Sequence, residues 1–184
     1  MLGLNFFERS RRFIRPEAAA EIVRELRAQG HRIECIGVFV DATPAVVRQI
    51  AAELQLDAVQ LHGNETPDVC AELQLLRVIK ALRVQSGFDP AEATRFPCET
   101  VLLDSWHARE AGGTGEAFDW AVAAEVRRVV PRLILAGGLH AGNVSAAIQQ
   151  VQPAAVDVCS GVEDAPGRKN RDRLRDFMEA VRSA

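Results

Sequence analysis

The sequence has no pair of cysteines at the spacing of a CxxC motif. Its four cysteines lie far apart, at positions 35, 70, 98 and 159. Zinc knuckles and thioredoxin-like redox pairs both need closely spaced cysteines, so neither kind of site is indicated. No signal-like apolar segment opens the sequence, and no apolar run approaches the roughly 20 residues that cross a bilayer. We therefore expect a protein of the reducing cytoplasm without a membrane partner.

The chain has no excess of positive charge either. Its 22 lysine and arginine residues stand against 25 aspartate and glutamate residues, which gives a formal net charge of −3. Proteins that bind nucleic acid usually present a basic face, so no nucleic-acid partner is expected. Two short basic clusters, 9–12 and 168–171, are interpreted as solvated surface. The length of 184 residues and the apolar share of 48% suit one domain with a single core.

Short apolar runs alternate with longer amphipathic segments, with no linker or low-complexity tract between them. The runs are too short for helices and suit parallel strands that are buried on both faces. The predicted strands are 2–6, 34–40, 58–61, 77–82, 100–104, 133–136 and 155–159. The predicted helices are 16–29, 44–54, 67–73, 119–130, 141–150 and 171–181, and the segment 86–96 is left unassigned. Thr43 and Thr66 each precede a proline, which is the pattern of a capped helix start.

This alternation predicts an α/β fold with a parallel sheet. A (β/α)8 barrel has eight strands and usually at least about 200 residues, whereas seven strands are counted here. A doubly wound sheet accepts six or seven strands, but its glycine fingerprint normally follows the first strand. The glycines of this chain cluster in its second half, which favours a TIM-barrel fold that lacks one βα unit. An open-sheet nucleotide binder is disfavoured, because no GxGxxG motif follows a strand.

Glycine-rich segments stand where such a barrel would bind an anion. Gly137-Gly138 and Ser160-Gly161 follow the last two predicted strands, and 112–115 precedes a predicted helix. Bare backbone amides can approach a phosphate closely, and the loops after the last two barrel strands are a recurring phosphate site. A single loop of this kind would be interpreted as a tight turn. Because there are three, we predict phosphate binding.

Polar side chains stand near the ends of predicted strands, where parallel α/β folds gather functional groups. Asp104 ends a strongly apolar strand, where a carboxylate is costly unless it is solvated, hydrogen-bonded or functional. It suits a general acid, or else it anchors a loop. His62 either lines a pocket or satisfies backbone groups, and Arg12 is either solvated or an anion contact. Asp157 is interpreted as a structural hydrogen-bonding residue.

Taken as a set, several segments occur in the order that one enzyme family shares. They are 2–6 with 10–14, 37–40, 59–65, 102–105, 112–115 with 118–120, 135–139 with 143–144, and 156–163 with 166–167. They are collinear and cover nearly the whole chain. The set resembles phosphoribosylanthranilate isomerase, a tryptophan-pathway enzyme with a (β/α)8 barrel.

The resemblance implies an Amadori rearrangement that uses no metal and no organic cofactor. N-(5-phosphoribosyl)anthranilate becomes 1-(2-carboxyphenylamino)-1-deoxyribulose 5-phosphate. A general acid protonates the furanose oxygen, the ring opens to a Schiff base, and a general base removes a proton from sugar carbon two. By resemblance, Asp104 is the general acid and Arg12 contacts the anthranilate carboxylate. The other substrate-binding positions are His62, Gly112, Gly113, Gly137, Gly138, Ser160 and Gly161. The expected partner is a small phosphosugar, bound by a monomer or a homodimer.

One family motif is missing from this sequence. The family's first strand ends in Lys-Ile-Cys-Gly, whose cysteine is the general base, and the present sequence has no such motif. It begins at what resembles the family's second strand, so a misplaced start or a truncation is one explanation. A repurposed or inactive barrel is another, and a different residue serving as base is a third. The alternative to an isomerase is therefore a non-catalytic or defective phosphosugar-binding barrel.

Cys159 is the residue considered as a replacement base. It stands two residues after Asp157 in the last predicted strand, so both side chains would face the barrel interior. The family commonly has serine at this position. The preferred interpretation is therefore that Cys159 only fills the place of a small residue, because reactivity needs a site that favours the thiolate.

Overall fold

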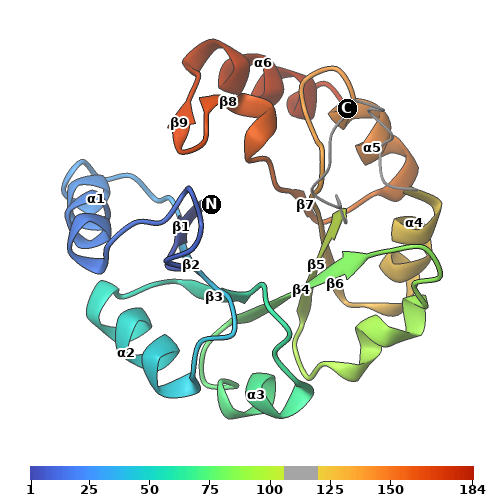
Figure 1. The fold of residues 1–184 in the computed structure, drawn as a ribbon. Coiled ribbons are helices and arrows are strands. Elements are labelled where there is room, and N and C mark those ends of the chain that lie inside the picture. The colour runs from blue at the N-terminus through green and yellow to red at the C-terminus, as the bar shows by residue number, and fades with distance from the viewer. Residues whose placement is uncertain (106–119) are drawn as a thin grey trace. The chain divides into compact units, whose positions relative to one another are not determined.

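The structure is a computed structural model, and it describes residues 1–105 and 120–184. The chain divides into two compact units, and Figure 1 labels their helices and strands. Unit 1 comprises residues 1–81 with 96–98, and unit 2 comprises residues 82–95 with 99–184. In the described part of the chain, no helix combines the length and the apolar character that crossing a membrane requires.

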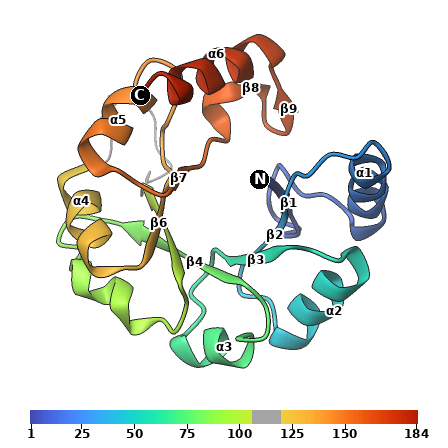
Figure 2. The same cartoon turned by 180° about the vertical axis from the view of Figure 1, so that it is seen from behind.

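Unit 1 repeats one pattern, in which each strand leads into a helix. Its strands pair in parallel and in chain order: β1 (Leu2–Asn5), β2 (Cys35–Phe39), β3 (Ala58–Leu61) and the first residues of β4 (Val78–Val84). The helices are α1 (Pro16–Ala28), α2 (Pro44–Leu54) and α3 (Pro67–Glu72). Figure 2 shows these three helices on one side of the strands. Because the strands are parallel, their carboxyl ends and the following loops lie along one edge of the unit.

The helix starts of unit 1 confirm the two predicted caps. The hydroxyl of Thr43 accepts a hydrogen bond from the backbone amide of Val46, and the hydroxyl of Thr66 accepts one from that of Val69. Each threonine thus satisfies one of the amides that a helix start leaves without an intrahelical partner. Behind these caps, a buried apolar cluster packs α2 and α3 against β2, β3 and β4. Its members are Phe39, Val47, Ala51, Val59, Leu61, Cys70, Leu73 and Val78.

Unit 2 contains a second parallel set of strands. They are β5 (Thr100–Ser105), β6 (Arg132–Leu135) and β7 (Ala155–Val156). In the register of β5 with β6, Leu103 pairs with Leu135. The α-helices are α4 (Trp120–Val129), α5 (Val144–Val151) and α6 (Arg171–Arg182). Two 3-10 helices, η1 (Pro90–Arg95) and η2 (Ser160–Val162), and a short antiparallel pair, β8 (Glu163–Ala165) with β9 (Arg168–Lys169), complete it. Val101, Leu102 and Leu103 are at most 1% exposed, as expected for a strand covered on both faces.

The structure confirms all seven predicted strands and corrects the sequence prediction in three places. The last strand ends at Val156, so Asp157 and Cys159 lie beyond it and the argument that they share a strand face is wrong. The physical reason is local: Cys159 has ψ −78° and turns the chain into η2. The β8–β9 pair was not predicted, and the unassigned segment 86–96 contains η1.

Candidate active site

His62 lies directly after β3, as predicted, and its backbone and its ring are both held in place. Its backbone amide donates to the carbonyl of Phe39 at 2.8 Å. The side-chain amide of Gln60 lies 2.7 Å from Nδ1 of the half-buried ring. This contact fixes the ring from one side. The strand end therefore presents an imidazole of defined orientation.

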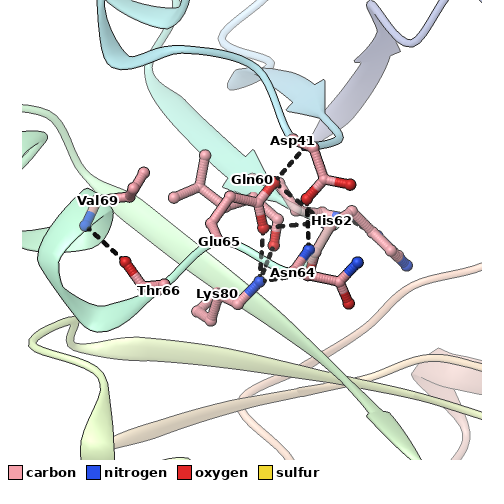
Figure 3. A network of polar contacts seen from close by, with 10 residues as sticks. Asp41, Gln60, His62, Asn64, Glu65, Thr66, Val69 and Lys80 are labelled. Atoms are coloured by element: carbon pink, nitrogen blue, oxygen red, sulfur yellow. Dashed lines mark hydrogen bonds and ion pairs between the residues drawn. The ribbon is translucent and has the colours of Figure 1, made fainter.

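The turn after His62 is held by a buried ion pair that the sequence analysis did not identify. Lys80 Nζ lies 2.6 Å from Glu65 Oε2, and both side chains are only 2% exposed. The same ammonium group donates to the carbonyls of Leu61 and Gly63. Figure 3 shows Lys80 and Glu65 pointing toward each other beneath this turn. Lys80 interrupts an apolar strand, and that was the available signal, since a buried charge requires a partner.

Arg12 lies in the loop between β1 and α1, and this loop is braced by Ser10. The Ser10 hydroxyl accepts from the Arg12 backbone amide at 3.1 Å and from the Asn5 side chain at 3.3 Å. A parallel bridge between Asn5 and Phe13 closes the loop. The half-buried Arg12 thus stands on a fixed backbone at the carboxyl end of β1, where the sequence analysis placed it.

Asp104 is the penultimate residue of β5 in unit 2 and is half-buried, next to three fully buried residues. Beyond it, the backbone amide of Ala136 donates to the carbonyl of Leu103 at 2.8 Å, which ties the ends of β5 and β6 together. A carboxylate thus stands where the apolar strand reaches its carboxyl end. The predicted positions Gly112 and Gly113 lie outside the described residues.

The loop after β6 contains two consecutive glycines in the left-handed region. Gly137 and Gly138 have φ of +85° and +64°, a conformation in which side chains are strained. Asn143 braces this loop, because its side chain donates to the carbonyl of Gly138 at 3.0 Å and accepts from the amide of His140 at 2.8 Å. The loop leads directly into α5, whose N-terminal end favours an anion.

The second predicted glycine segment lies against the first. A Cβ atom built on Gly161 would collide with the carbonyl oxygen of Leu139 and lie 3.1 Å from the Cβ of His140. Only glycine allows η2 to approach the loop after β6 so closely. Ser160 and Gly161 thus lie beside the loop that contains Gly137 and Gly138 within unit 2, which brings the two predicted glycine segments together.

Cys159 is exposed and lies next to charged groups. Its sulfur is 3.5 Å from Lys169 Nζ and 3.7 Å from Glu163 Oε1, and Lys169 also pairs with Glu163 at 3.0 Å. These contacts belong to η2 and the β8–β9 pair. Among the described residues, no group of three or more histidine, cysteine, aspartate or glutamate side chains could hold a metal ion.

The cysteines differ in expected reactivity because they differ in burial. Burial raises the pKa of the Cys70 thiol to about 11 and also raises the pKa values of Cys35 and Cys98. A raised thiol pKa means less thiolate, the reactive form, at any given pH. We expect one thiol per folded chain to react rapidly with a disulfide reagent at pH 8, and Cys159→Ser to abolish that phase. Rapid labelling of Cys70 in the folded protein would contradict this.

Parallel strands that carry polar side chains and bare glycine amides at their carboxyl ends define an enzyme scaffold of the α/β-barrel type. The family model described as N-(5'phosphoribosyl)anthranilate (PRA) isomerase matches residues 1–180. The isomerase of Trichlorobacter lovleyi is 43% identical over 185 residues, covering 100% of this chain and 87% of that protein. The chain therefore belongs to the phosphoribosylanthranilate isomerase family.

Solved structures of isomerases support the same family assignment. A crystal structure of phosphoribosyl anthranilate isomerase from Thermotoga maritima has a TM-score of 0.87 and 37% identity, covering 99% of this chain and 87% of that one. A second isomerase structure, in complex with reduced 1-(o-carboxyphenylamino)-1-deoxyribulose 5-phosphate, has a TM-score of 0.82 and 35% identity over the same shares. These structures confirm the TIM-barrel fold class predicted from the sequence.

Proposed function

We propose that this chain acts as a phosphoribosylanthranilate isomerase in tryptophan biosynthesis. The observation that carries the proposal is the family match along residues 1–180, with Asp104 at the carboxyl end of β5. The reaction moves two hydrogen atoms within one molecule and consumes no oxidant or reductant. It is the conversion of N-(5-phosphoribosyl)anthranilate into 1-(2-carboxyphenylamino)-1-deoxyribulose 5-phosphate.

The proposed roles are given for the described residues of each unit by itself. In unit 2, Asp104 gives a proton to the furanose oxygen, which lets the ring open to a Schiff base. Phosphate binding is assigned to the amides of the Gly137–Gly138 turn and of Ser160–Gly161, because backbone amides of glycine-rich loops can approach a phosphate closely. In unit 1, Arg12 pairs with the anthranilate carboxylate and His62 contacts the substrate.

Proton removal from sugar carbon two is assigned to no described residue. The printed sequence has no Lys-Ile-Cys-Gly segment, and Cys159 stays a candidate without assigned chemistry. A phosphosugar-binding barrel without turnover is therefore the second candidate function. One observation favours an isomerase with a replacement base over a binding protein without turnover. Cys159 is exposed and lies beside Lys169.

Calorimetry with the reduced product analogue found in the related crystal structure tests the proposal. We expect the chain to bind it and inorganic phosphate to compete. A measurement of the conversion of phosphoribosylanthranilate into the ketose product by chromatography then separates an isomerase from a binding protein. Absence of analogue binding would contradict both candidates.

We expect Gly138→Val to abolish inhibition by inorganic phosphate. A valine side chain would cover the amides of the turn and would be strained at φ +64°. Gly87→Val is the matched control in the same unit, since Gly87 has φ +82° and its Cβ would meet nothing within 4 Å. The control carries the same backbone strain without touching the cradle. Unchanged phosphate inhibition in Gly138→Val would place the anion elsewhere.

A further inference from the structure

The buried pair of Lys80 and Glu65 connects β4 with the segments that follow β3 and β2. Lys80 comes from β4, and its ammonium donates to Glu65 at 2.6 Å and to the carbonyls of Gly63 at 2.8 Å and Leu61 at 3.3 Å. These three acceptors match the three protons of the ammonium group. Glu65 follows β3, and its carboxylate accepts from the amides of Gly63 and Asp41 at 2.9 Å each. Asp41 in turn follows β2.

The backbone around His62 is thereby held on both sides. The carbonyl before it, that of Leu61, and the carbonyl after it, that of Gly63, both accept from Lys80. The amide of Asn64 donates to Asp41 Oδ1 at 2.6 Å, and Asp41 itself has φ +52°. A non-glycine residue in this left-handed region is strained and persists only where its surroundings hold it.

The turn is also packed too closely to adjust. A Cβ atom on Gly63 would lie 2.6 Å from the backbone nitrogen of Asp41 and would collide with its carboxylate. The loops after β2 and β3 are therefore locked against each other, with the Glu65 carboxylate bonded to both (Figure 3). We expect a substitution at Lys80 or Glu65 to shift His62 or Asp41, because the two loops are in close contact at Gly63 and Asp41.

Residue choice supports a specific role for the ammonium group. Only two of the 22 basic residues in the chain are lysine, at positions 80 and 169, and all others are arginine. An ammonium group is compact and reaches three acceptors around a point, whereas a guanidinium is planar and larger. Lys80 Nζ also lies 5.6 Å from the ring centroid of Phe96, within the range of a cation–π contact.

A buried ion pair is weak evidence for stability, because apolar residues of similar volume often stabilise a protein as well. The hydrogen bonds of this pair are specific, in contrast, and they fix the loop that carries His62. We propose that Lys80 and Glu65 are positioning residues, which hold His62 and the 63–64 peptide where they contact the part of the substrate other than its phosphate. This inference rests on the proposed function.

The test compares two ligands, the reduced product analogue and inorganic phosphate. We expect Lys80→Met to lower the affinity for the analogue at least about tenfold, while the affinity for inorganic phosphate changes less than about twofold. Arg77→Met is the matched control, since Arg77 also belongs to unit 1 and pairs with Glu34 at 2.7 Å, but both side chains are over 40% exposed. This control should change neither affinity.

Two further measurements keep the test decisive if Lys80→Met does not fold. Glu65→Gln keeps an acceptor for both backbone amides and should show the same selective loss. In the unmodified protein, the analogue should shift the ring signals of His62, assigned with His62→Gln, and inorganic phosphate should not. The relevant signals are few, because the chain has four histidines.

The results of these measurements support or overturn the positioning role of Lys80 and Glu65. Selective loss of analogue affinity with a shifted His62 signal supports the positioning role. Normal analogue affinity in a folded Lys80→Met or Glu65→Gln variant overturns it, and so does an equal loss of both affinities, which would mark a merely structural pair. An unmodified protein that does not bind the analogue contradicts the proposed function itself, and that result is distinct from normal binding by the variants.

Discussion

Replacing Asp104 by asparagine should lower turnover at least about a hundredfold and change substrate affinity much less. A positioned general acid contributes roughly 10²–10⁴-fold, and the N–H groups of an amide are far too weakly acidic to protonate the furanose oxygen. Asp104 is half-buried at the end of β5, beside three residues that water does not reach. The substitution keeps the size of the side chain, so the strand end should keep its shape.

Turnover is measured at saturating substrate in a form that is catalytically competent. That form is the printed chain or, where it shows no turnover, a chain extended with the family's Lys-Ile-Cys-Gly unit. Asp89→Asn is the control, because Asp89 is an exposed aspartate of unit 2 that caps Ala91. The reduced analogue should bind Asp104→Asn about as tightly as the unmodified protein. Near-normal turnover in Asp104→Asn would end its assignment as general acid.

Local signals in the sequence were sufficient for most of the fold. Thr43 and Thr66 identified helix starts because a cap depends on residues only three positions apart. The strands were predictable because continuous apolar runs such as Val101–Leu103 match burial on both faces. The end of β7 was not predictable in this way, because Ala155–Val156 continues into residues that alternate as a strand would but turn into η2.

The residues of the candidate site also differ in whether local sequence signals predict them. Asp104, His62 and the Gly137–Gly138 turn could be proposed from the sequence because they stand at or just after the ends of apolar strands, and this needs no knowledge of distant contacts. The Lys80–Glu65 pair joins residues 15 positions apart on different elements. Neither residue predicts the other from the sequence, since the pairing depends on the register of β3 with β4. Long-range polar pairs of this kind require coordinates.

Lys80→Met should lower the free energy of unfolding by about 3–5 kcal/mol, because removal of one partner leaves the other charge buried and uncompensated. This is a large part of the roughly 5–15 kcal/mol that holds a typical domain together. The double variant Lys80→Met/Glu65→Gln should be less destabilised than the sum of its single variants, since it leaves no buried charge. A single glutamine oxygen can still accept from both amides, because Glu65 Oε1 accepts from Asp41 at 2.9 Å and from Gly63 at 3.1 Å.

Urea unfolding of the four proteins in this cycle measures the coupling between the two side chains, expected at about 1–3 kcal/mol. The same cycle on Arg77 and Glu34, with Arg77→Met and Glu34→Gln, provides the comparison. That pair lies 2.7 Å apart with side chains 44% and 43% exposed, and exposed pairs contribute at most about 1 kcal/mol. A coupling for Lys80 and Glu65 no larger than that of the exposed pair would show that the buried charges are compensated by other groups. Such a result would contradict the prediction that the buried charges of Lys80 and Glu65 compensate each other.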